Sequence, residues 1–176
     1  MHIDYLDQHR EHVATLAAWH HAEWGHLYDE WTLAVARAEL ADQATRRTLP
    51  TTLVLLDEGR PIGSVSLVLE DAPELCEEGS PWLASLFVLP EFRGRGLGAK
   101  LVHAAVEVAA REKVEHLFLF TPEHAGFYER LGWRLIARTA LKGTAVDLMQ
   151  IEPMSCASRR CLPASGDAPA ALEDAA

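Results

Sequence analysis

The spacing of hydrophobic residues predicts two helices near the start of the chain. Apolar side chains recur at intervals of three and four over residues 7–21, and again from Trp31 to about Arg46. This is the period of a helix with one buried face. A polar segment, Glu23–Glu30, separates the two stretches, and Pro50 closes the second. The buried face of the second helix is predicted to consist of Leu33, Ala36, Leu40 and Ala44.

Three β-strands are predicted next, because β-branched and aliphatic residues dominate three short runs. These runs are Thr51–Leu56, Pro61–Leu69 and Trp82–Leu89. Asp57–Arg60 has the composition of a hairpin turn between the first two. Residues 70–81 carry acidic side chains, a glycine and two prolines, which predicts an exposed loop before the third strand.

The rest of the chain alternates helices and strands. The predicted elements are a helix from Leu97 to about Lys113, a strand His116–Phe120, a short helix Glu123–Leu131, and strands Trp133–Arg138 and Thr144–Ile151. Helices mixed with a mostly antiparallel sheet define an α+β domain, which we place at residues 1–151. Residues 152–176 are rich in Ala, Ser and Pro, and are predicted to form a disordered tail.

Composition narrows the class of protein. The 176 residues, 49% of them hydrophobic, suit a single domain with a sizeable core. No apolar run approaches the roughly 20 residues that span a bilayer, and the start of the chain lacks a signal-peptide pattern. We therefore expect a cytoplasmic protein that does not bind membranes. The net charge of −10 is poorly suited to nucleic acid and better suited to a cationic substrate such as an amine.

No metal site is predicted. The three cysteines lack zinc-ligand spacing. His20, His21 and His26 lie close together in the sequence, but no His-Glu-x-x-His motif is present. Adjacent histidines on a helix also face different directions.

The segment after the third predicted strand carries the most specific chemistry. That strand ends at Pro90 and a helix starts near Leu97, with three glycines and two arginines nearby. Glycine lets the backbone approach a ligand closely, and the free N–H groups at a helix start favour an anion. Arginines add charge-assisted contacts. The turn Arg93–Gly98 is therefore predicted to hold a phosphate or pyrophosphate.

Two common nucleotide motifs do not fit this turn. The Walker A motif requires Gly-Lys-Ser/Thr, whereas Ala99 separates Gly98 from Lys100. The dinucleotide motif G-x-G-x-x-G is also missing, because the glycines alternate with single residues. The segment instead contains Arg-x-x-Gly-x-Gly, formed by Arg93, Gly96 and Gly98.

A strand followed by Arg-x-x-Gly-x-Gly and a helix resembles the acetyl-CoA signature of the GNAT family of N-acetyltransferases. A second motif supports the resemblance. The strand that ends with LFLF leads to Thr121 and then to AGFYERLGW, residues 125–133, which is similar to the family's helix with Phe-Tyr before a glycine and an aromatic residue. With the opening helices and strands, the resemblance covers roughly residues 1–151. It implies the GNAT fold, a central and mostly antiparallel mixed sheet flanked by helices.

The resemblance implies acetyl-CoA as co-substrate. In the family, backbone amides of the glycine turn hold the pyrophosphate, and the preceding strand pairs with the pantetheine arm. The residues implied for this chain are Leu86, Phe87, Val88, Arg93, Gly94, Arg95, Gly96, Leu97, Gly98, Ala99 and Thr121. Many members have Asn in place of Thr121, so a helix-capping role is an equal alternative for that residue.

Tyr128 matches the family tyrosine near the CoA sulfur, where a phenol can protonate the departing thiolate. The alternative for Tyr128 is a core aromatic residue with a satisfied hydroxyl group. In the family, the region between the first two helices usually faces the acceptor. The tentative acceptor contacts are His21, Glu23 and Trp24 from that region and Ser85 from the third strand. A structural or solvated role is the alternative for each, and no position can be assigned as general base.

The sequence therefore predicts an N-acetyltransferase that moves acetyl from acetyl-CoA to a primary amine by direct transfer in a ternary complex. Two alternatives are a catalytically silent CoA-binding sensor and a transferase of another acyl group. The acceptor class stays open among peptides, proteins, polyamines, aminoglycosides and metabolites. A homodimer is also left open.

Overall fold

The computed structural model describes residues 1–75 and 77–154. Most of the predicted disordered tail lies outside this range. The strands are β1 (His2–Tyr5), β2 (Thr51–Asp57), β3 (Arg60–Val68), β4 (Trp82–Val88), β5 (Leu117–Thr121), β6 (Arg134–Leu141) and β7 (Thr144–Ile151). The α-helices are α1 (Val13–Trp24), α2 (Leu33–Gln43), α3 (Leu97–Arg111) and α4 (Ala125–Glu129).

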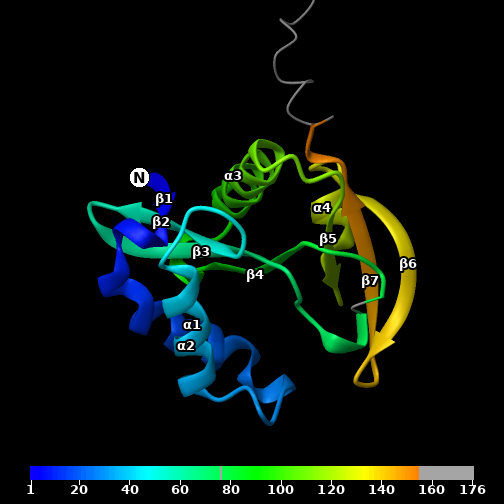
Figure 1. Cartoon of the computed structure of the whole chain (residues 1–176), viewed down its shortest axis with the longest axis horizontal. Coiled ribbons are helices and arrows are strands. Elements are labelled where there is room, and N and C mark those ends of the chain that lie inside the picture. The colour runs from blue at the N-terminus through cyan, green and yellow to red at the C-terminus, as the bar shows by residue number, and fades with distance from the viewer. Residues whose placement is uncertain (76, 155–176) are drawn as a thin grey trace, which may run out of the picture.

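The strands form one sheet with the order β1-β2-β3-β4-β5-β7-β6. Every neighbouring pair is antiparallel except β4 and β5, which are parallel and share a single registered pair, Trp82 opposite Phe118. Beyond this pair the two strands separate, so that the sheet divides into two halves (Figure 1). The predicted mixed, mostly antiparallel sheet is confirmed.

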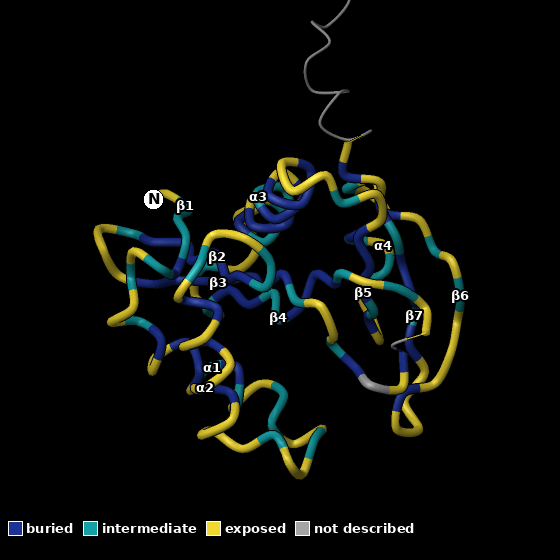
Figure 2. Tube along the Cα trace, viewed as in Figure 1, coloured by how far each residue is buried: buried dark blue, intermediate teal, exposed yellow. Residues whose placement is uncertain are grey.

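Helices cover both faces of the larger half of the sheet (Figure 1). Alternate residues of β2 face opposite ways: Leu53 and Leu55 belong to the core that includes Leu101 of α3, whereas Val54 and Leu56 pack with α1 and α2. Because both faces are covered, β2 and β3 are buried along nearly their whole length (Figure 2). This explains their nearly continuous apolar sequences.

The N-terminal segment differs from the prediction. Residues 2–5 form an edge strand that the sequence pattern does not predict, and two 3₁₀ turns follow before α1 begins at Val13. A strand of four residues is too short to show a clear alternation. The placement of Leu33 on a buried face is also wrong, since its side chain is 46% exposed. Helix α2 begins there because the Thr32 hydroxyl accepts a hydrogen bond from the N–H of Val35.

The segment between β3 and β4 is not the fully exposed loop that was predicted. Ala72 and Leu75 are buried in a cluster with Trp82, Phe118 and residues of β6 and β7. The segment therefore joins the two halves of the sheet at the end where β4 and β5 meet. Asp71 directly precedes Ala72, and its charge acts on Tyr128 of α4.

Candidate active site

The glycine turn has a backbone conformation suited to binding an anion. Gly94 and Gly96 have φ values of +74° and +73°, in the left-handed region that favours glycine. Gly96 caps α3 without any side-chain hydrogen bond, so the first N–H groups of the helix remain free to bind a ligand. Arg93–Gly96 are exposed, and Gly98 is only partly buried. Free N–H groups at a helix start are the donors that a phosphate requires.

The two arginines lie against the turn. The Nε of Arg93 donates a hydrogen bond to the carbonyl of Val88 (2.8 Å), and its guanidinium carbon lies 5.6 Å from the ring centroid of Phe87. Arg95 donates to the carbonyl of Glu91 (3.1 Å) and lies over the ring of Phe92. Both guanidinium groups are thereby held beside the exposed N–H groups of the turn.

Replacement of Arg93 tests the assignment of the turn. We expect Arg93→Ala to weaken CoA binding by about tenfold, because it removes one charge-assisted contact to phosphate. Isothermal titration with CoA measures the change. Arg111→Ala, at the opposite end of α3, is the matched control and should bind like the wild type. Equal affinities for the two variants would contradict the assignment of Arg93.

Strand β4 is interrupted by a bulge near its middle. Ala84 is opposite Ser66 and Phe87 is opposite Ser64, so two residues of β4 face one residue of β3. Ser85, one of the two, has a φ of +51°. A bulge disturbs the ladder and leaves backbone groups unpaired. Because β5 has also moved away, the edge of β4 beyond Trp82 is free to pair with a ligand.

Gly63 of β3, which is opposite Val88 and close to this bulge, is required by close packing. A methyl group built on Gly63 of β3 would lie 2.7 Å from the backbone carbonyl oxygen of Phe87, closer than such contacts allow. The bulged segment of β4 therefore depends on the missing side chain of Gly63. The Phe87 side chain points to the helical layer, where it contacts the rings of Trp19, His20 and Trp24. The side chains of Phe87 and Val88 are buried in the core, whereas that of Leu86 is only partly buried.

Tyr128 lies on α4 near the start of α3. The ring of its neighbour Phe127 lies close to Gly98 at the start of α3, since a methyl group built on Gly98 would be 3.6 Å from that ring. The two helices are therefore close together at this point. The Tyr128 ring is buried against Phe127 and Trp133. Within residues 1–75 and 77–154, no hydrogen bond engages its hydroxyl group. Burial, together with the charge of Asp71, raises the pKa of Tyr128 to about 12, so the phenol keeps its proton at neutral pH.

The hydroxyl of Thr121 is already used within the chain. It accepts a hydrogen bond from the backbone N–H of His124 (3.1 Å), and the side chain is buried. This arrangement orders the turn before α4 and agrees with the alternative capping role. A side-chain contact between Thr121 and CoA stays a prediction.

The tentative acceptor residues are distributed over two regions. Glu23 lies 3.9 Å from the guanidinium of Arg93, on the side of the glycine turn. Trp24 packs against Phe87, and His21 contacts the ring of Trp31. The structure therefore brings Glu23 and Trp24 to β4 and the turn, while His21 faces the start of α2. Their acceptor roles stay predictions.

Asp71 is a titratable residue that sequence reasoning did not single out and whose charge acts on Tyr128. Its charge also acts on Tyr28 from the α1–α2 connection, and the charge of Glu39 of α2 acts on Asp71. Burial, with Glu39 adding to it, raises the pKa of Asp71 to about 7. No hydrogen bond or ion pair engages this carboxyl group in the part of the chain that the structure describes. A carboxyl group with such a pKa can exchange protons near neutral pH.

A contact between distant segments lies at the separated halves of the sheet. The Nζ of Lys142, in the turn between β6 and β7, lies 4.3 Å from the ring centroid of Tyr28. Cation–π contacts of this kind contribute about 0.5–1 kcal/mol at exposed sites. The α1–α2 connection and the β6–β7 turn thus meet across the separated halves of the sheet, near Asp71.

The separation of β4 from β5 and the glycine turn before α3 are the arrangement expected of a CoA-dependent acyltransferase. The chain belongs to the acetyltransferase (GNAT) family, whose model matches residues 13–133. The predicted family and fold are therefore confirmed. Family membership also agrees with acetyl-CoA as co-substrate.

Individual relatives match parts of the chain. A mycothiol acetyltransferase of Thermobispora bispora is 36% identical over 87 residues, which make up 47% of this chain and 30% of that protein. The match thus spans less than a third of the relative's length.

No helix among the described residues has the length and apolar character needed to cross a membrane.

Solved structures share the fold at low sequence identity. An aminoglycoside 6'-N-acetyltransferase complexed with coenzyme A is 15% identical, with a TM-score of 0.68 over 87% of this chain and 97% of that chain. A Salmonella typhimurium protein solved with its cofactor acetyl-CoA is 19% identical, with a TM-score of 0.65 over 98% and 99%.

Proposed function

We propose that this protein transfers an acetyl group from acetyl-CoA to a positively charged primary amine, by direct transfer in a ternary complex. The unpaired carboxyl group of Asp71 is the main observation in favour. Its charge acts on Tyr128, on the thioester side, and on Tyr28, on the acceptor side. An acidic group between these two tyrosines is suited to receive an ammonium ion and to accept its proton.

The donor half of the proposal rests on the backbone. The glycine turn binds the pyrophosphate through the N–H groups at the start of α3. The pantetheine arm pairs with the free edge of β4, as a peptide pairs with a sheet edge. A backbone N–H near Phe87 or Val88 stabilises the negative charge that develops on the thioester oxygen.

Two side chains of this chain accept and donate the protons of the reaction. Asp71, as carboxylate, takes one proton from the bound ammonium ion and passes it to solvent. The neutral amine then forms a C–N bond to the acetyl carbon as the C–S bond breaks. Tyr128 gives its proton to the departing sulfur, and the second proton lost by the nitrogen restores the phenol. One proton is released to solvent overall.

A charged acceptor is favoured by the acidic surroundings of Asp71. The charges of Asp71 and Glu74 both act on Tyr28, and that of Glu39 acts on Asp71. Three carboxyl groups from α2 and the β3–β4 segment therefore lie around the acceptor side. Polyamines and aminoglycosides carry several amines and fit this charge better than a neutral amino compound.

A cytoplasmic location stays a prediction.

Thiol release distinguishes this proposal from a silent CoA-binding sensor. The protein is incubated with acetyl-CoA and a panel of amines of increasing positive charge, and free thiol is monitored. We expect release that depends on the acceptor and is fastest for amines with two or more charges. Binding of CoA without acceptor-dependent release would instead identify a sensor, and preference for another acyl-CoA would overturn the choice of donor.

A further inference from the structure

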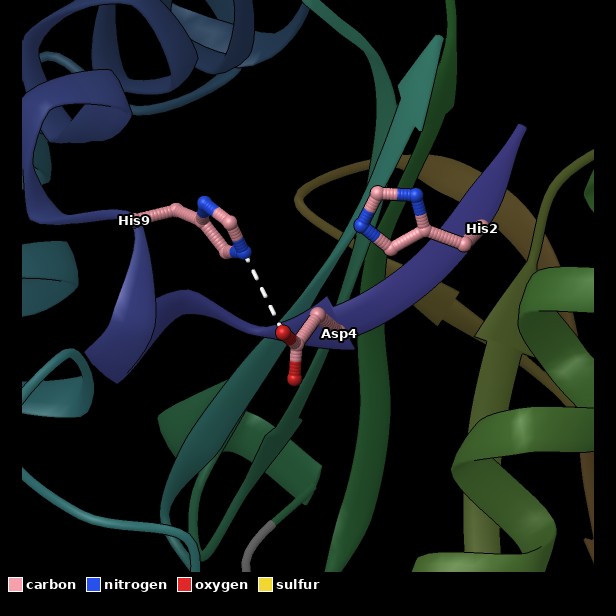
Figure 3. A group of neighbouring side chains, drawn as sticks. All are labelled: His2, Asp4 and His9. Carbon is pink, nitrogen blue, oxygen red and sulfur yellow. Dashed lines mark hydrogen bonds and ion pairs between the residues drawn. The ribbon is translucent and has the colours of Figure 1, made fainter. Parts of the chain in front are cut away.

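A group of histidine and carboxylate side chains gathers at the N-terminal edge of the sheet. His2 and Asp4 lie two residues apart on β1, so their side chains share one face of the strand. The turn after β1 brings His9 back over that face (Figure 3). One potential ligand atom from each residue lies within 4.8 Å of those of the other two. This group is separate from the active site and from His20, His21 and His26.

The carboxyl group of Asp4 has a fixed orientation. Its Oδ1 accepts a hydrogen bond from the backbone N–H of Tyr5 (2.8 Å), and its Oδ2 lies 3.2 Å from the Nε2 of His9. One oxygen is thus held by the backbone, and the other points to the centre of the group, as Figure 3 shows. The separation of 3.2 Å is close to the spacing of about 3.3 Å between ligands of a tetrahedral zinc ion.

A second carboxylate is placed to orient His9. The Oε1 of Glu11 lies 3.8 Å from the Nδ1 of His9, on the side of the ring opposite Asp4. Histidine ligands commonly donate the N–H of their other ring nitrogen to a carboxylate, which sets the tautomer and the direction of the ring. Glu11 can perform this role after a small side-chain rotation.

We propose that His2, Asp4 and His9 bind a divalent transition-metal ion, with zinc as the best-suited member. Two imidazole nitrogens and one carboxylate oxygen form a ligand set typical of zinc, with water in the fourth position. His2 is exposed, and no hydrogen bond holds it within the described residues. Its ring can therefore turn toward the ion at little cost. The ion would fasten β1 to the turns that precede α1.

His12 is not part of the proposed ligand set. It lies near His9 and Glu11, and these three also bring their ligand atoms within 4.8 Å of one another. However, its Nε2 already lies at hydrogen-bond distance, 3.1 Å, from the carbonyl oxygen of Gly59. Coordination by that nitrogen would break this bond to a group that is not a ligand, whereas the hydrogen bond between His9 and Asp4 joins two proposed ligands and is replaced by their bonds to the ion. The competing centre is consequently less favourable, and a His12 variant distinguishes the two.

The test uses the full chain without an affinity tag, treated with a chelator and desalted. Zinc chloride is titrated into the wild type and into the variants His2→Ala, Asp4→Asn, His9→Ala and His12→Ala, with His26→Ala as the control for an exposed histidine outside the group. Calorimetry gives the stoichiometry and Kd, and thermal unfolding gives Tm with and without zinc. Circular dichroism verifies that each variant is folded.

We expect one zinc ion per chain and a Tm that rises with zinc concentration, because the ion binds only the folded state. His2→Ala, Asp4→Asn and His9→Ala should each weaken binding at least about tenfold, while His12→Ala and His26→Ala bind like the wild type. His2→Ala changes an exposed side chain, so loss of binding in this variant does not depend on damage to the fold. Absence of zinc binding in the wild type, or loss in His12→Ala without loss in His2→Ala, would overturn the proposal.

Discussion

Tyr128→Phe is expected to lower turnover at least about a hundredfold, within the range that general acid catalysis contributes. The substitution removes one hydroxyl group and keeps the ring that packs between Phe127 and Trp133. CoA affinity and Tm should therefore stay close to those of the wild type. Steady-state kinetics with saturating acetyl-CoA, together with a CoA titration, separates the loss of turnover from any loss of binding.

The matched control for this prediction is Tyr5→Phe, which deletes the same group from a tyrosine on β1 and should leave turnover unchanged.

The pH profile of turnover is a second test of the role of Tyr128. Burial raises the pKa of Tyr128 to about 12, so its proton remains in place across the neutral and mildly alkaline range. Activity should therefore not fall as the pH rises from 7 through that range. Turnover of Tyr128→Phe equal to that of the wild type at every pH would refute the role of this residue as the acid.

Asp71→Asn is expected to lower turnover by about a hundredfold above pH 7, because the amide cannot accept a proton from the acceptor. In the wild type, burial raises the pKa of Asp71 to about 7. The basic form therefore dominates above that pH, and activity should fall as pH decreases through about 7. The variant should lack this limb of the profile. Glu70→Gln, one residue earlier and exposed, is the control.

Stability distinguishes a catalytic role of Asp71 from damage to the fold. The folded-state pKa lies above the ordinary value of 3.8, so the folded chain holds the proton more tightly than the unfolded chain does. The associated stability is present below about pH 4 and is lost as pH rises through about 7. Asp71→Asn removes this loss, and its free energy of unfolding at pH 8 should equal or exceed that of the wild type. A variant with unchanged kinetics would show that another group is the base.

Local patterns predicted the conformation of the segment before α3 well. The turn from Arg93 to Gly98 consists of consecutive residues. Its left-handed glycines and the start of the helix could therefore be predicted from the sequence alone. Strands β2 and β3 were likewise predictable, because runs of mostly apolar residues are typical of strands that are covered on both faces. Tyr128 was assigned by its motif, and its position near the start of α3 agrees with that assignment without testing it.

Features that depend on long-range packing could not be predicted. Asp71 has no local motif, and its raised pKa follows from its own burial in the folded chain and from the charge of Glu39 on α2. Strand β1 was missed because four residues carry too little periodicity. The contact of Lys142 with Tyr28 joins segments distant in sequence. The position of Glu23 beside Arg93 depends on the packing of α1 on β4 in the same way.

The central claim is acetyl transfer from acetyl-CoA to an amine, and mass spectrometry of the acceptor tests it most directly. The wild type, Tyr128→Phe and Asp71→Asn are each incubated with isotopically labelled acetyl-CoA and a polyamine, and the labelled product is quantified and fragmented. The account predicts a labelled acetyl group on a primary nitrogen, formed rapidly by the wild type and slowly by both variants. Thiol release without any labelled amine, or an equal yield from all three proteins, would contradict it.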